Sequence, residues 1–208
     1  MTQTVAAREV TLHDLRAKFG LELVFDDDLF PEWSEDLPAI SESEQLALDR
    51  IKRNYLYLLE YPMMESIVKM LVLAPLLDIA GFYEPPFRVN GETNIAVLAE
   101  DEGEIIRGSI DVLVVQDQLW VTTIEAKNSQ FSISKATPQT LAYMLAAPNL
   151  ERPVFGAILN GSEFLFLKLV RNQSFQYATS NLFSLLNHGN DLCSVLRVLK
   201  KLRELIST

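Results

Sequence analysis

Three charged residues near the middle of the chain have the types and the spacing of a divalent-metal site. Asp111 interrupts one apolar run, and Glu125 and Lys127 end the next one after thirteen intervening residues. Two neighbouring carboxylates are costly to bury unless a cation lies between them, and a divalent metal ion supplies that charge. The alternative is a structural ion cluster, in which Lys127 pairs with both carboxylates.

Two strands are expected to position these residues. Residues 105–115 and 119–126 are rich in Val, Ile, Thr and Trp, a composition that favours strands over helix. The three residues between them suit a hairpin loop. The sequence therefore predicts a twisted hairpin with the charged residues near its end.

The register of this hairpin decides whether the carboxylates share a face. The expected register pairs Val115 with Leu119. Because side chains alternate along a strand, Asp111 then lies opposite Thr123 and on the same face as Glu125. A two-residue loop would break this parity and place Asp111 against even-numbered residues.

A helix and a buried strand are expected next. The helix can begin near Ser132, or at Thr137 with this residue as N-cap. Gln139 and Tyr143 lie four residues apart and so share a helical face. The apolar run 154–159 follows one helix after the second strand, which predicts a parallel, right-handed crossover.

Together these residues resemble the core signature of the PD-(D/E)XK nuclease superfamily, the restriction endonuclease-like proteins. The lead-in to Asp111 is similar to that of the superfamily, although Ile110 stands where Pro is usual. The Q-x-x-x-Y element matches RecB-like nucleases and the nuclease module of type I restriction enzyme R subunits. The resemblance covers roughly residues 60–170. The residues that carry it are Asp111, Glu125, Lys127, Gln139 and Tyr143.

The resemblance implies an α/β fold with a restriction endonuclease-like mixed sheet flanked by helices, and a DNA endonuclease that uses Mg²⁺, which Mn²⁺ can replace. It implies that Lys127 orients or deprotonates the attacking water, or stabilises the developing charge. Gln139 and Tyr143 would contact the DNA backbone or orient Lys127. The alternative for this pair is a half-buried amide and phenol at the edge of the core. The implied metal ligands are Glu65, Asp111, Glu125 and the carbonyl oxygen of Ala126.

Glu65 is assigned by the resemblance alone, because the helix before the sheet often supplies a further Glu in these enzymes. The alternatives are an i,i+4 ion pair with Lys69, or a favourable charge at a helix N-terminus. The surrounding helix, over residues 62–80, is apolar on most sides and is expected to be buried. Pro75 should kink it or start a new turn, and Gly81 should end it.

The chain is expected to divide into an N-terminal arm, residues 1–40, and a nuclease-like domain, residues 41–208. Thr11 is a candidate N-cap in the arm, and Ser41 and Glu44 form a candidate capping box at the start of the domain. Trp33 is interpreted as an anchor that packs the arm on the core.

Several turns and strands complete the expected fold. Asn90-Gly91 predicts a hairpin, so that residues 87–127 would form an antiparallel meander of about four strands. Residues 163–170 and 174–179 are expected to pair as strands. Residues 182–206 are expected to be helical with a break at 187–190, and the basic side chains near the end are interpreted as cations at a helix C-terminus.

Composition bounds the functional classes. The 208 residues carry a net charge of −10 at pH 7, which argues against strong DNA binding because phosphate contacts need Lys and Arg. Either DNA binds weakly, or a partner supplies affinity, or the protein is not a nuclease. The single cysteine, Cys193, excludes an intrachain disulfide and a cysteine-based zinc site. The absence of a long apolar stretch and of a signal-peptide pattern predicts a cytoplasmic protein without a membrane partner.

A second hypothesis keeps the fold but not the chemistry. The acidic balance and the apolar N-terminal arm favour a catalytically idle nuclease-fold protein that acts as a binding or regulatory module. Its partners would be a second copy, in a homodimer, or a larger restriction-type complex. A third hypothesis is a plain α/β scaffold in which the charged trio is coincidental.

Overall fold

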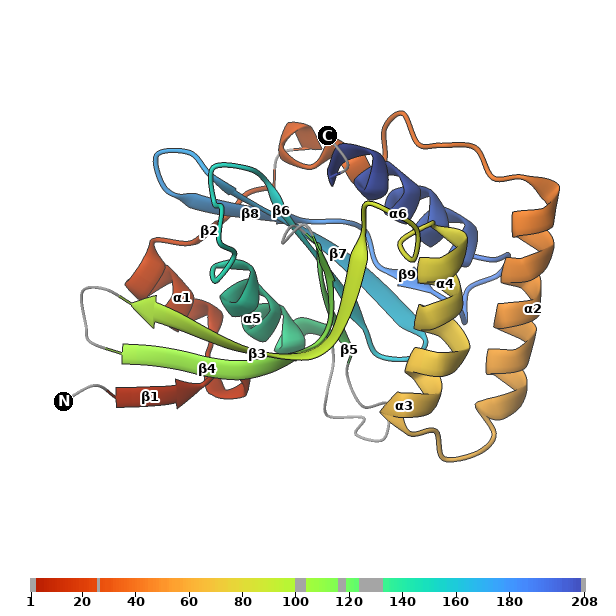
Figure 1. The fold of residues 1–208 in the computed structure, drawn as a ribbon, viewed down its shortest axis with the longest axis horizontal. Coiled ribbons are helices and arrows are strands. Elements are labelled where there is room, and N and C mark those ends of the chain that lie inside the picture. Colours follow the sequence, from red (N-terminus) through yellow and green to blue (C-terminus); the bar gives the residue numbers. More distant parts are fainter. Residues whose placement is uncertain (1–2, 26, 100–103, 116–118, 124–132, 207–208) are drawn as a thin grey trace.

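The computed structural model describes residues 3–25, 27–99, 104–115, 119–123 and 133–206, and these form one mixed β-sheet with helices on both faces (Figure 1). The strands are β1 (Gln3–Ala6), β2 (Glu22–Leu23), β3 (Arg88–Ala99), β4 (Glu104–Val115), β5 (Leu119–Thr123), β6 (Val154–Leu159), β7 (Glu163–Arg171), β8 (Phe175–Thr179) and β9 (Phe183–Ser184). Their order is β1-β4-β5-β6-β7-β8-β2, with β3 paired to β4 and β9 paired to β7. The predicted α/β class, with a mixed sheet flanked by helices, is confirmed.

Two apolar cores lie on the two faces of this sheet. The main helices are α1 (Leu12–Phe19), α2 (Glu42–Leu58), α3 (Glu65–Val68), α4 (Ala74–Ile79), α5 (Ile133–Met144) and α6 (Leu192–Ile206). Residues of α2, α4 and α6 belong to one core, and residues of α1 and α5 belong to the other. Strand β6 faces both: Phe155 and Leu159 join the first core, whereas Val154 and Ile158 join the second.

The N-terminal segment is part of the sheet, which corrects the expected division at residue 40. β1 pairs in parallel with β4, and β2 pairs in parallel with β8, so the segment contributes strands to both ends of the sheet. Leu15 and Phe30 are fully buried in the two cores. Trp33 packs on the core as predicted, with its ring centroid 6.5 Å from that of Phe183.

The predicted N-cap at Thr11 and the predicted capping box at Ser41 and Glu44 are both present, and Thr11 also forms a capping box with Asp14. The hydroxyl of Thr11 accepts a hydrogen bond from the Asp14 backbone, and the Asp14 carboxylate accepts one from the Thr11 backbone. Ser41 and Glu44 make the same reciprocal pair at the start of α2, at 2.7 Å and 3.3 Å. Gly20 ends α1 in the left-handed conformation, with φ of 63°.

The helix predicted before the sheet forms in three consecutive parts, but it is buried on one side only, because Ile67 and Met70 are 38 % and 70 % exposed. α3 continues through a π-helical segment, Lys69–Leu73, into α4. Pro75 accounts for the change, because it has no N–H for the carbonyl four residues earlier and its ring would clash there. The wider π turn, closed by the Ala74 N–H donating to the carbonyl five residues earlier, accommodates it. Gly81 follows with φ of 82°, and the helix stops there as predicted.

The hairpin predicted at Asn90-Gly91 does not form. β3 runs through both residues, with Asn90 opposite Leu113 and Gly91 opposite Val112. The antiparallel part of the sheet in this region is therefore β3-β4-β5, three strands where about four were expected. Long-range pairing with β4 along its whole length outweighs the local turn preference of the dipeptide.

The remaining connections agree with the expectations up to residue 181. β6 pairs in parallel with β5 after the helix α5, as a crossover requires, and β8 pairs antiparallel with β7. Residues 182–191 are not helical: they form β9 and turns, and α6 begins at Leu192. No helix among the described residues is long and apolar enough to cross a membrane.

Candidate active site

Asp111 lies on β4 at the point where this strand changes its neighbour. One edge of β4 pairs with β3 along its whole length. On the other edge, residues 104–107 pair with β1, and residues 112–114 pair with β5. Asp111 therefore lies beside the gap between the C-terminal ends of β1 and β5, which follow one another along this edge of β4.

The register of the β4–β5 pair differs from the expected one. Val114, rather than Val115, lies opposite Leu119. A shift of one residue reverses the parity of the pair, because side chains alternate along each strand. The expectation that Asp111 lies opposite Thr123 is therefore wrong, and this register does not place Asp111 on the face of the odd-numbered residues of β5, which was the argument for a shared face with Glu125. Four residues separate the paired Val114 and Leu119 in the sequence, where the expected register had three between its paired residues.

Three of the expected site residues lie beyond the part of the chain that the structure describes. Glu125, Ala126 and Lys127 fall in residues 124–132, between the end of β5 and the start of α5. The side chain of Asp111 is also outside the description. Among the described residues, no group of three His, Cys, Asp or Glu could hold a metal ion. The expected ligand set therefore stays a prediction.

Glu65 opens α3, and its described partner is Lys69. The Lys69 Nζ lies 2.5 Å from Glu65 Oε1, and both side chains are about one-third exposed or less. This is the i,i+4 ion pair that the sequence offered as an alternative, and the carboxylate also stands in the first turn of a helix, where a negative charge is favourable. Carboxylate oxygens are the donors that Mg²⁺ prefers, so the same group fits a metal by its donor type.

Gln139 and Tyr143 meet on α5, which runs through both from Ile133. The Gln139 Nε2 donates to the Tyr143 hydroxyl at 2.7 Å, and Tyr143 is 1 % exposed while Gln139 is half-buried. Of the two helix starts left open by the sequence, the earlier one is correct. Thr137 lies inside the helix, and its hydroxyl donates to the carbonyl of Ile133 rather than capping.

α5 sits close to the sheet because β6 carries a glycine beneath it. A Cβ on Gly156 would lie 2.7 Å from Met144 Sδ and 3.2 Å from Thr140 Cγ2, distances too short for ordinary contact. The missing side chain therefore sets the separation of helix and sheet. The close packing of α5 on β6 also sets the distance of the Gln139–Tyr143 pair from the sheet.

The basic residues at the end of the chain are engaged within the fold. Lys200 bonds to Glu44 at 2.9 Å and to the carbonyl of Ala39, and Lys201 bonds to the carbonyl of Asp36. Arg203 bonds to the carbonyl of Gly81. These bonds hold the N-terminal segment and neighbouring helices.

One buried ion pair was missed from the sequence. The Nζ of Lys168, on β7, lies 2.5 Å from Glu32 Oε1, and both side chains are largely buried. The same ammonium group lies 5.9 Å from the ring centroid of Phe155. A lysine in the otherwise apolar run of β7 indicates that a buried acidic partner exists. The sequence around Lys168 does not show that this partner is Glu32, which lies more than a hundred residues earlier.

Comparison with models of known protein families gives no match, and comparison with curated protein sequences gives none either.

Proposed function

We propose that the protein is a metal-dependent nuclease that hydrolyses DNA phosphodiester bonds, with a restriction endonuclease-like fold related to the nuclease module of type I restriction R subunits. The observation that carries the proposal is the position of Asp111 beside the gap between the ends of β1 and β5. The strand β5 leads in sequence to Glu125-Ala126-Lys127. The proposal is that these residues return to the same edge of the sheet as Asp111.

The order of the surrounding elements supports the same proposal. A helix, α3 to α4, precedes the antiparallel strands β3, β4 and β5, and α5 then crosses to the parallel strand β6. Glu65 and the Gln139–Tyr143 pair come from the two helices that flank these strands. The order of these elements along the chain is the order that the proposed fold requires.

The proposed mechanism assigns each residue a task. Asp111, Glu125, the carbonyl oxygen of Ala126 and Glu65 supply the oxygen donors of the metal site. Bound Mg²⁺ would polarise the phosphate and lower the pKa of the attacking water.

Lys127 orients or deprotonates that water, or stabilises the charge that develops on the phosphate oxygens. Attack of the water forms a new P–O bond, and the bond to the leaving oxygen breaks as that oxygen gains a proton.

DNA affinity is expected to be weak for the isolated chain. The net charge is −10, and Lys200, Lys201 and Arg203 already bond within the fold. Acidic side chains outnumber basic ones, 28 to 18, so the chain as a whole repels the negatively charged phosphates of DNA. We therefore infer that a larger restriction-type complex supplies part of the affinity for DNA.

Plasmid cleavage in Mg²⁺ tests this proposal. Asp111→Ala and Lys127→Ala should each reduce the cleavage rate by at least about a hundredfold while leaving the thermal unfolding transition cooperative. Glu9→Ala and Arg197→Ala change the net charge by the same amounts at exposed positions and should cleave like the wild type. Unchanged cleavage by the first two variants would refute the proposal.

A second candidate, a catalytically idle binding module, is favoured by one observation. The end of α2 and the start of the next helix expose large apolar side chains, among them Tyr57 at 65 % and Met70 at 70 %. Tyr57 and Tyr61 also contact each other, with ring centroids 6.1 Å apart. Clustered apolar exposure of this kind marks protein interfaces.

Light scattering tests the homodimer form of this second candidate. A wild-type dimer that becomes monomeric in Met64→Glu/Met70→Glu would support it, and a wild-type monomer at high concentration would reject it. Deletion of residues 1–40 is unsuitable here, because those residues form part of the sheet and of both cores.

A further inference from the structure

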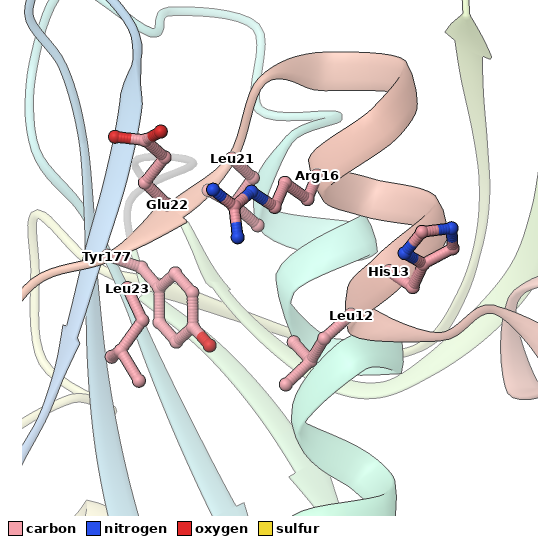
Figure 2. A pocket seen from close by; sticks show the side chains of 7 residues that line it. All are labelled: Leu12, His13, Arg16, Leu21, Glu22, Leu23 and Tyr177. Carbon is pink, nitrogen blue, oxygen red and sulfur yellow. The ribbon is translucent and has the colours of Figure 1, made fainter.

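A pocket of about 520 Å³ lies between α1 and the sheet edge formed by β2 and β8 (Figure 2). Its volume falls in the range of small-molecule sites in proteins. Leu12 and Leu23 stand on opposite sides of it, on α1 and β2, and are 40 % and 41 % exposed. Tyr177 and Leu21 are almost wholly buried and complete its apolar lining. The pocket shares no residue with the proposed metal site.

The Tyr177 side chain brings a hydroxyl group to this pocket. Tyr177 is 4 % exposed and lies opposite Leu23 in the β2–β8 pair. Figure 2 shows its hydroxyl pointing into the pocket toward Leu12, and within the described part of the chain this hydroxyl has no hydrogen-bond partner. Burial raises the pKa of Tyr177, so the hydroxyl keeps its proton and is available to donate.

Arg16 supplies a cation at the same pocket. It lies one turn after Leu12 on α1, and its guanidinium extends toward β2 in Figure 2. It forms no ion pair with a described carboxylate. Glu22 also lines the pocket, but its carboxylate points away from the Tyr177 hydroxyl in the same view. The negative charge of Glu22 repels anionic ligands, and the repulsion grows with the ligand's charge. The pocket therefore favours ligands with a single negative charge.

We propose that this pocket binds a small organic carboxylate. The ligand carboxylate pairs with the Arg16 guanidinium, whose planar donors match a carboxylate in bidentate geometry. The apolar body of the ligand lies between Leu12 and Leu23 over the Tyr177 ring and removes both leucines from water. The Tyr177 hydroxyl donates to a second acceptor on the ligand. This site is independent of the proposed nuclease chemistry.

Titration with simple probes tests the proposal, with binding followed by ligand-observed NMR on the full chain. The probes are benzoate, phenylacetate and cyclohexanecarboxylate, with neutral benzamide and cationic benzylamine for comparison. At least one carboxylate should saturate at concentrations on the order of tens of millimolar or below, as expected for ligands of this size. Benzamide and benzylamine should bind at least about tenfold more weakly, because neither can form the charge-assisted pair.

Three variants and a control locate the site. Arg16→Gln should weaken the carboxylate by at least about tenfold and leave benzamide unchanged. Tyr177→Phe, which keeps the buried ring, should weaken a carboxylate that carries a second acceptor, such as 4-hydroxybenzoate, more than benzoate. Leu23→Ser should weaken all the aromatic probes. Arg197→Gln removes an exposed arginine on α6 and should leave every affinity unchanged.

Three results would overturn the proposal. The first is the absence of saturable binding for every carboxylate. The second is equal affinity for benzylamine and benzoate, which would indicate apolar contact without a role for charge. The third is an unchanged carboxylate affinity in Arg16→Gln, which would place the carboxylate elsewhere on the protein.

Discussion

At the scale of single residues, Glu65 is the expected metal ligand whose side chain the structure describes. Its carboxylate pairs with Lys69 at 2.5 Å, one helical turn away. An ion pair on a partly exposed helix contributes only about 0.3–0.5 kcal/mol, so stability alone gives Glu65 a minor task. A metal ion bound at Glu65 would displace the Lys69 ammonium group, because both cations bind the same carboxylate oxygens.

Two variants separate the structural task from the metal-binding task. Glu65→Gln should weaken Mn²⁺ binding by about tenfold or more, whereas Lys69→Met should strengthen it, because it removes the competing cation. Both should change the free energy of unfolding by less than about 0.5 kcal/mol. Calorimetric titration and urea unfolding measure the two quantities. If both variants bind Mn²⁺ as the wild type does, Glu65 is a helix residue and not a ligand.

At the scale of secondary-structure elements, the capping boxes show how local sequence fixes a helix start. Ser41 and Glu44 exchange hydrogen bonds at the start of α2, and Lys200 of α6 bonds to the same Glu44 carboxylate. Burial raises the pKa of Glu44, but the hydrogen bonds from Ser41 and Lys200 outweigh it and hold the pKa below its usual value. The stability of this helix start therefore depends on pH.

The sign of this coupling gives a prediction. Because its pKa is lowered in the folded state, the ionised Glu44 carboxylate stabilises the protein at pH values above its unfolded-state pKa of about 4.3. This stabilisation is lost as the pH falls through the folded-state pKa. Glu44→Gln should cost about 1 kcal/mol at pH 7 and much less at about pH 3. Urea unfolding at the two pH values measures this difference. Glu42→Gln, at an exposed position in the same helical turn, should show a smaller cost; equal costs for both would contradict the capping account.

Elements with local signals could be predicted from the sequence, and those that depend on distant partners could not. The caps at Thr11 and Ser41 and the stop at Gly81 use neighbouring backbone groups and formed as expected. Asn90-Gly91 is a strong turn signal, but pairing with β4 keeps it extended. The β4–β5 register depends on which residue opposes Leu119, and one residue of error reversed the expected face.

At the scale of the whole molecule, the N-terminal segment joins both ends of the sheet. β1 and β2 are short, and their partners, β4 and β8, lie about a hundred residues or more along the chain. Nothing in residues 1–25 has a periodicity long enough to reveal such pairing. The same limit applies to the candidate site: the residue types and spacing are visible in the sequence, but their meeting depends on how separate elements pack.

This arrangement predicts that the segment is required for folding. Deletion of residues 1–40 removes the buried side chains of Leu15, Leu21 and Phe30 and exposes the faces they cover. Loss of one such leucine to alanine typically costs about 2–5 kcal/mol, which is comparable to much of a domain's stability. The truncated chain should therefore lose its cooperative thermal transition by circular dichroism. A transition at the wild-type temperature would show that the segment is dispensable.

The most direct test of the central claim is a calorimetric titration of Mn²⁺ into the wild type and into Asp111→Asn, with plasmid cleavage measured in the same buffer. The account predicts saturable binding to the wild type, weakened by at least about tenfold in the variant together with loss of cleavage. Equal binding by the two proteins, or no binding to either at millimolar metal, would contradict a metal site at Asp111.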